Sequence, residues 1–146
     1  MTRLKRWLLS LTSTMKIDPS EYSYRVSENR AASLGYALAG WLYMLRRQKN
    51  TRIQSVASIV VIALALWLQI SPLELALIVL TITIVWMAEF LNAAVEAVID
   101  LSSPEFHPMA KVGKDVASAA VLLGVIASII IGLLILGPPL VAKLSA

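Results

Sequence analysis

The sequence contains no cysteine and a single histidine in 146 residues. A disulfide framework, a thiolate metal site and a cysteine nucleophile are therefore excluded, and any metal binding falls to oxygen ligands. The chain also lacks a Gly-rich Walker loop and the loop motifs of protein kinases. A nucleotide would have to be bound by an unrelated architecture.

Charged residues are scarce as well: they make up 15% of the chain, against 58% hydrophobic residues and a mean hydropathy of +0.76. This composition is too apolar for a soluble domain and predicts a single-domain membrane protein. Ten of the 13 lysines and arginines lie in residues 1–52, ahead of the first apolar stretch. The net charge of +4 therefore indicates membrane topology, and nucleic acid is excluded as a partner.

Long stretches without charge predict three membrane-spanning helices, at about residues 53–70, 72–100 and 112–136. The first stretch has 21 uncharged residues, enough at roughly 1.5 Å per residue to cross a hydrocarbon core of about 30 Å. The third has 27 uncharged residues, and Gly137-Pro138-Pro139 is expected to end its helix. We therefore expect an all-α membrane protein.

The turn between the first two spans is predicted to be very short. Ser71 is a helix-capping residue, Pro72 suits the first position of a helix, and Glu74 completes a capping box. The second span should therefore start immediately after the first one ends.

Two amphipathic segments precede the spans. Residues 28–50 predict a helix on the membrane surface, because apolar residues recur at helical spacing between charged ends. Residues 1–27 form a basic, amphipathic extension. The distribution of positive charge places these segments and the loop at 101–115 on the cytoplasmic side, and the carboxyl terminus outside.

One face of the second span is acidic, and we call it the acidic face: it comprises Glu89, Asn92, Glu96 and Asp100. At about 100° per residue, these side chains project within roughly 80° of one another. Ionisable groups in a membrane helix are costly, so such a face predicts a functional site. A rise of roughly 25 Å from Pro72 puts Glu89 near the cytoplasmic interface, with Glu96 and Asp100 closer to water.

The residues alone leave three interpretations of this face. In the first, Glu89 and Glu96 only hold helices together by pairing with Lys111, Lys114 or Arg52. An ion or proton path is disfavoured, because the polar residues gather at one interface. The third is an enzyme that acts on a lipid headgroup, in which one carboxylate is a general base, others bind Mg²⁺, and lysines neutralise phosphate.

Three motifs carry a family resemblance. E-x-x-N-x-A-x-E-x-x-x-D begins at Glu89, A-K-x-x-K-D ends at Asp115, and Asn50-Thr51-Arg52-Ile53 precedes both. Together they resemble the small prokaryotic diacylglycerol kinase and undecaprenol kinase family. The likeness spans roughly residues 28–137.

The resemblance implies a lipid kinase that transfers the γ-phosphate of MgATP to a membrane lipid alcohol, diacylglycerol or undecaprenol. It also implies a homotrimer in the bacterial inner (cytoplasmic) membrane, with active sites shared between subunits and facing the cytoplasm. Glu89 would be the general base and Glu96 the Mg²⁺ ligand. The implied nucleotide-binding residues are Asn92, Asp100, Lys114, Asp115 and Arg52.

One position departs from the family pattern. The family usually places a second metal-binding Glu four residues before Arg52, where this chain has Gln48. An amide oxygen can coordinate Mg²⁺ but brings no charge, so affinity for a second metal should fall. The alternative function is accordingly a non-catalytic membrane scaffold that retains the fold.

Two further residues are expected to have structural roles. His107 lies in a loop and should pack or hydrogen-bond rather than bind metal. Lys143 should be a terminal anchor that snorkels to the membrane surface.

Overall fold

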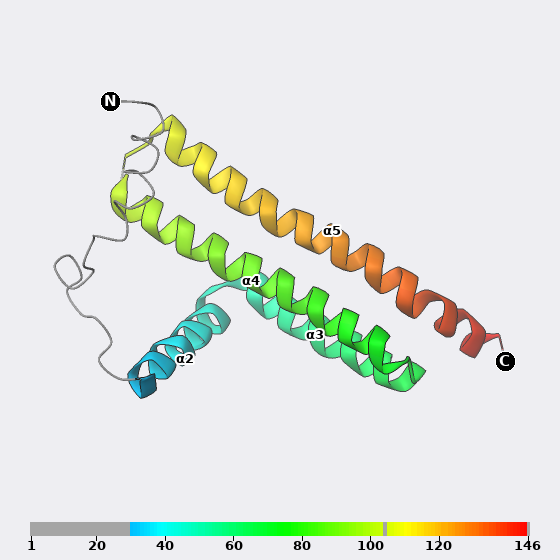
Figure 1. The fold of residues 1–146 in the computed structure, drawn as a ribbon. Helices are drawn as coiled ribbons and strands as arrows, with labels where there is room; N and C mark the ends of the chain where they lie inside the picture. The colour runs from blue at the N-terminus through cyan, green and yellow to red at the C-terminus, as the bar shows by residue number, and fades with distance from the viewer. Residues whose placement is uncertain (1–29, 104, 146) are drawn as a thin grey trace, which may run out of the picture. The chain divides into compact units, whose positions relative to one another are not determined.

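The computed structural model describes residues 30–103 and 105–145, and the predicted extension of residues 1–27 lies outside the described residues. Every regular element in the described part is an α-helix (Figure 1). The helices are α2 (Arg30–Arg47), α3 (Lys49–Leu68), α4 (Pro72–Ser102) and α5 (Pro108–Leu144). The all-α prediction is confirmed for this part of the chain.

The chain divides into two compact units, residues 1–42 and 43–146, and each is described by itself. The described residues of the first unit, 30–42, belong to α2. Leu34, Leu38 and Trp41, which belong to the apolar side of the predicted surface helix, are exposed there. The location of this helix on a membrane surface stays a prediction.

In the second unit, α3, α4 and α5 are each long and apolar enough to cross a membrane. Among the described residues, these three helices meet that criterion. This confirms the predicted number of spans. The 31 residues of α4 rise about 46 Å, well beyond a hydrocarbon core of about 30 Å. This helix is therefore longer than an apolar layer, and its acidic side chains lie in its carboxyl-terminal part.

The turn between α3 and α4 is as short as the sequence predicts. Gln69 ends α3 in the left-handed conformation, with φ 56° and ψ 42°. The Ser71 hydroxyl accepts a hydrogen bond from the Glu74 backbone N–H at 3.3 Å, and the Glu74 carboxylate accepts one from the Ser71 N–H at 2.7 Å. The capping box is confirmed, and it fixes α3 and α4 as an antiparallel pair.

A small apolar core holds the three helices together near this turn. It consists of Ala65 and Leu68 of α3, Ile78 of α4 and Leu136 of α5, all buried. Beyond the core, α5 continues along α4 toward the other end of the unit (Figure 1). The packing of α4 on α5 therefore determines the geometry at the acidic end of α4.

The prediction that Gly137-Pro138-Pro139 ends the third span is wrong. Both prolines lie inside α5, which continues to Leu144. A proline removes one backbone N–H, but its fixed φ is compatible with a helix, and membrane helices tolerate it where neighbouring groups take up the freed backbone atoms.

The additional turns of α5 bring Lys143 to the end of α3. Its Nζ donates a hydrogen bond to the Trp67 carbonyl oxygen at 2.8 Å and lies 4.5 Å from the centroid of the Trp67 ring. The last carbonyl groups of a helix lack partners within the helix, and Lys143 supplies one from another helix. Lys143 therefore ties α5 to α3, in addition to any contact with the membrane surface.

We expect Lys143→Met to lower the stability of the protein by about 1 kcal/mol, since the Trp67 carbonyl and ring both lose their cation. Lys143→Arg keeps a cationic donor and should retain most of the stability. Thermal unfolding in detergent micelles, followed by circular dichroism, measures the difference. An unchanged Tm for Lys143→Met would contradict this role.

Candidate active site

The candidate site lies where α4 ends and α5 begins. Ser103 caps α4 through its backbone N–H, which donates to the Ile99 carbonyl at 2.8 Å. His107 caps α5: its Nδ1 accepts a hydrogen bond from the Met109 backbone N–H at 3.2 Å. The expected hydrogen-bonding role of His107 is thereby confirmed, and the short loop sets the two helix ends side by side.

Glu89 is the innermost member of the acidic face. Its side chain is buried, with 4% of the residue exposed, whereas the Asp100 side chain is 65% exposed. Among the described residues, the Glu89 carboxylate has no hydrogen-bond or ion-pair partner. Its oxygens are not among the fully buried side-chain atoms that lack a partner, so the carboxylate remains accessible to a bound hydroxyl or cation.

Asn92 and Glu96 form a hydrogen-bonded pair one turn further along α4. Asn92 Nδ2 donates to Glu96 Oε1 at 3.1 Å. Ser118 of α5 donates from its hydroxyl to Asn92 Oδ1 at 3.4 Å. The two bonds orient the Asn92 amide and leave the other oxygen of Glu96 open.

Sequence reasoning missed Ser118. A signal for it existed, because Ser118 lies four residues after Lys114 and therefore on the same side of the helix. What the sequence lacked was the pairing of α4 with α5, which brings that side of α5 to Asn92.

Two ion pairs occupy the outer part of the site. Lys114 of α5 pairs with Asp100 of α4, and Lys111 pairs with Asp115 within α5. The interpretation in which Lys111 or Lys114 pairs with Glu89 or Glu96 is therefore wrong, because the lysines lie level with the outer carboxylates rather than the inner ones.

Close approach of the two helices supports the Lys114–Asp100 pair. A Cβ atom at Gly113 would lie 2.8 Å from Cδ1 of Ile99, well inside van der Waals contact. Glycine thus lets the start of α5 lie against the last turns of α4. The Ile99 contact is with the end of a flexible side chain, so an alanine here would be accommodated by a small shift.

Gln48 and Arg52 lie at the start of α3. Gln48 is the residue at which the backbone breaks between α2 and α3, with φ −92° and ψ 119°. In the part of the chain that the structure describes, neither side chain forms a hydrogen bond or ion pair with the acidic face. Within a single chain, these two predicted residues therefore make no polar contact with the acidic face, unlike Lys114, which pairs with Asp100.

The described residues contain no group of three or more His, Cys, Asp or Glu side chains that could hold a metal ion. Mg²⁺ typically keeps several waters and binds one or two carboxylates together with substrate phosphates. The open oxygen of Glu96 suits a Mg²⁺ ion that is bound by one carboxylate together with substrate phosphates. The residues present suit a metal that arrives with a nucleotide rather than a permanently bound one.

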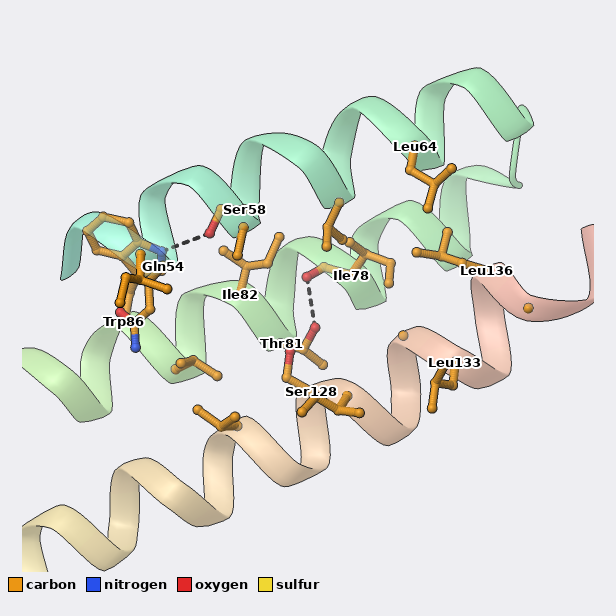
Figure 2. A pocket seen from close by; sticks show the side chains of 18 of the residues that line it. Gln54, Ser58, Leu64, Ile78, Thr81, Ile82, Trp86, Ser128, Leu133 and Leu136 are labelled. Carbon is orange, nitrogen blue, oxygen red and sulfur yellow. Dashed lines mark hydrogen bonds between the residues drawn. The ribbon is translucent and has the colours of Figure 1, made fainter. Parts of the chain in front are cut away.

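A groove opens between α3, α4 and α5, with a volume of about 580 Å³, and we call it the apolar groove (Figure 2). Gln54, Ser58 and Trp86 lie at one end of it, and Leu64 and Leu136 lie at the other. The Trp86 indole N–H donates to the Ser58 hydroxyl at 3.1 Å. Because Trp86 lies one turn before Glu89 on α4, the polar end of the groove adjoins the acidic face.

The Lys114–Asp100 pair is half exposed, so we expect it to contribute less than about 1 kcal/mol to stability. A double-mutant cycle with Lys114→Ala and Asp100→Ala, measured by thermal unfolding in micelles, gives this value. The single variants should stay folded, so any loss of function in them arises at the site. A coupling well above 1 kcal/mol would instead make the pair a structural element.

The family model and the similar proteins point to the same family. The model of the prokaryotic diacylglycerol kinase family matches residues 35–136. The chain is 38% identical over 121 residues to a diacylglycerol kinase from Synechocystis, which covers 82% of this chain and 69% of the relative. It is 31% identical over 96 residues to a diacylglycerol kinase from Escherichia coli K12, covering 66% of this chain and 79% of the relative.

A relative with a different name also matches. The undecaprenol kinase of Bacillus subtilis is 36% identical over 95 residues, which is 65% of this chain and 77% of the relative. The family match spans most of α2 and all of α3 and α4, and includes the part of α5 that carries Lys111, Lys114 and Asp115. The chain therefore belongs to the prokaryotic diacylglycerol kinase family, a family of lipid kinases.

Proposed function

We propose that this protein transfers the γ-phosphate of ATP, bound with Mg²⁺, to the hydroxyl group of a membrane lipid alcohol, either diacylglycerol or undecaprenol. One observation carries the proposal: along one face of α4, a buried carboxylate without a partner is followed by an oriented Asn–Glu pair and then by a lysine-bearing ion pair. This order matches the order of groups from a lipid hydroxyl to a nucleotide phosphate.

Glu89 is the general base in this proposal. Its burial supports the role, because a lipid hydroxyl reaches the site from the apolar layer and meets this carboxylate first. Glu89 accepts the hydroxyl proton, the hydroxyl oxygen forms a bond to the γ-phosphorus, and the bond from that phosphorus to the leaving ADP oxygen breaks. A phosphorylated lipid and ADP result.

Glu96 and Asn92 would hold the metal end of the nucleotide. A bound Mg²⁺ ion would neutralise part of the negative charge on the phosphates. Glu96 lies seven residues beyond Glu89, about 10 Å along the helix axis. Asn92 keeps the Glu96 carboxylate oriented through their hydrogen bond at 3.1 Å, so its open oxygen faces the site.

Lys114, Asp100 and Asp115 complete the nucleotide site in this proposal. Lys114 exchanges its pairing with Asp100 for a pairing with phosphate oxygens, which is inexpensive because the ion pair is exposed. Arg52 would contribute a second cation. Because Arg52 and Gln48 make no polar contact with the acidic face in the described part of a single chain, we propose that subunits of a homotrimer share each site.

The proposed location is the bacterial inner membrane, with the amino terminus and the active site on the cytoplasmic side. The asymmetry of Lys and Arg supports this orientation, since ten of the 13 lie in residues 1–52. ATP is available on that side.

Incubation of the purified protein with MgATP and either lipid alcohol in mixed micelles tests the proposal. Glu89→Gln should lower kcat by about 10²-fold or more, because the variant lacks the general base. The variant should still bind MgATP, since Glu96 and Lys114 are intact. If neither lipid is phosphorylated above the Glu89→Gln background, the proposed reaction is wrong.

Gln48 favours one alternative, a membrane scaffold that retains the fold without the chemistry. Such a protein would bind no ATP in a Mg²⁺-dependent manner, and Glu96→Ala would leave nucleotide binding unchanged. Equilibrium binding of ATP with and without Mg²⁺ separates the two functions.

We expect Gln48→Glu to lower the Mg²⁺ concentration that gives half-maximal activity, because a carboxylate binds the cation more strongly than an amide does. Gln48→Ala, which removes the amide oxygen, should raise that concentration. A Mg²⁺ titration of the three proteins provides the measurement. Identical titration curves would show that position 48 does not contact the metal.

A further inference from the structure

The apolar groove contains a polar atom that nothing satisfies. Gln54 Oε1 is buried and has no hydrogen-bond partner in the described residues. Two other polar groups at the groove are paired: the Ser58 hydroxyl accepts from Trp86, and the Thr81 hydroxyl donates to the Ile78 carbonyl at 2.9 Å. A buried acceptor without a donor costs about 1–3 kcal/mol, so the Gln54 carbonyl requires a donor from outside the described residues.

Thr51 Oγ1 is the other buried side-chain atom without a partner in the described part of the chain. Thr51 lies one turn before Gln54 but does not line the groove. Gln54, by contrast, is drawn at the mouth of the groove beside Trp86 (Figure 2). Of the two residues with an unsatisfied atom, only Gln54 lines the groove.

The register of α3 against α4 places Gln54 at the depth of Glu89. The bond from Trp86 to Ser58 pairs these two residues across the antiparallel helices. Because the helices are antiparallel, the residue one turn before Ser58 on α3 lies level with the residue one turn after Trp86 on α4. This step leads from Ser58 to Gln54 and from Trp86 to Phe90, the residue next to Glu89.

The shape and lining of the groove indicate a hydrocarbon occupant. From Gln54 to Leu64 the groove follows α3 for ten residues, about 15 Å, and apolar side chains line most of it. Its volume of about 580 Å³ is in the usual range of sites for small ligands. An occupant must therefore combine a long hydrocarbon chain with a hydrogen-bond donor at the end near Glu89.

We infer that Gln54 is a specificity-determining residue that recognises the hydroxyl group of the lipid alcohol, while a hydrocarbon chain of that lipid lies in the apolar groove. The inference rests on the proposed function for the identity of the ligand. The docked hydroxyl donates to Gln54 Oε1. Rotation about its C–O bond then turns the same proton to the Glu89 carboxylate.

This contact selects the substrate from the surrounding lipids. A phosphatidylcholine headgroup has no hydrogen-bond donor, so it leaves the Gln54 carbonyl unsatisfied. The phosphorylated product presents an anion to the same carbonyl oxygen, which is unfavourable and favours release. Recognition of a hydroxyl by a buried amide thus discriminates against the product and against lipids whose headgroups carry no hydrogen-bond donor.

Gln54→Leu tests the inference, because it removes the acceptor and keeps an apolar side chain of similar size. The KM for the lipid alcohol in mixed micelles should rise about three- to tenfold. The KM for MgATP should change much less, because the Gln54 side chain lines the apolar groove and none of the proposed nucleotide groups does. Gln54→Glu restores an acceptor and should recover most of the lipid affinity.

A second readout separates recognition from structure and needs no ATP. Without lipid alcohol, Gln54→Leu should not lower Tm, because the carbonyl it removes is unsatisfied. Added diacylglycerol should raise the Tm of the wild type in phosphatidylcholine micelles, and raise that of Gln54→Leu by less. Thr83→Val is the matched control: Thr83 is exposed on α4, bonds only to the Val79 carbonyl and lies outside the groove.

Two results would overturn the inference: an unchanged lipid KM in an active Gln54→Leu enzyme, or equal stabilisation of both proteins by diacylglycerol. Failure of the proposed function looks different, since the wild type would then phosphorylate neither lipid. In that case the stabilisation by lipid alcohol still decides whether Gln54 recognises a hydroxyl.

Discussion

Burial of the Glu89 carboxylate is the constraint on which the rest of the site depends. An ionisable group in an apolar helix is unfavourable unless a partner compensates it, and the described residues offer Glu89 none. Glu89 lies three residues after Trp86, the last residue of α4 that lines the apolar groove. The neighbouring polar groups, from Asn92 to Asp100, are each paired and progressively more exposed. The unsatisfied carboxylate is thus an isolated feature of an otherwise well-paired face.

Packing of α4 on α5 provides the alignment that the chemistry needs. Three contacts define it along the shared length: Lys114 with Asp100, Ser118 with Asn92, and Gly124 with Val85, where a Cβ on the glycine would lie 3.7 Å from a Val85 methyl carbon. These pairs follow one antiparallel register. A shift of one residue would rotate the lysine and the serine away from the acidic face together, because successive residues on a helix differ by about 100°.

Much of the fold follows from local rules in the sequence. The capping box at Ser71 and Glu74 determines where α4 begins, and from that point the helical period fixes both the acidic face and its depth. The apolar stretches give the three spans for a similar reason, since length and hydropathy are local properties. The family motif supplied the candidate residues, and the structure brings Asn92 next to Glu96 and Asp100 next to Lys114.

The remaining features depend on tertiary contacts that no local pattern encodes. Gly137-Pro138-Pro139 signals a helix end in isolation, yet α5 continues and Lys143 reaches the Trp67 carbonyl across the unit. Ser118 and Gln54 are ordinary polar residues in apolar stretches until the helix register is known. Gln54 in particular is identified because no donor bonds to its side-chain carbonyl oxygen. The lack of a donor can be recognised only when the positions of the surrounding side chains are known.

In the proposed function, the exposed ion pairs would hold the lysines in position before a nucleotide binds. Without ligand, Lys114 and Lys111 would repel each other and move freely, but Asp100 and Asp115 hold them beside the acidic face. Because both pairs are exposed, each is worth little, and a polyanion can replace the aspartates at low cost. Released aspartates then add negative charge next to Glu96, where a divalent cation would be bound. In the proposed function, this released charge would partly compensate for the carboxylate that Gln48 does not provide.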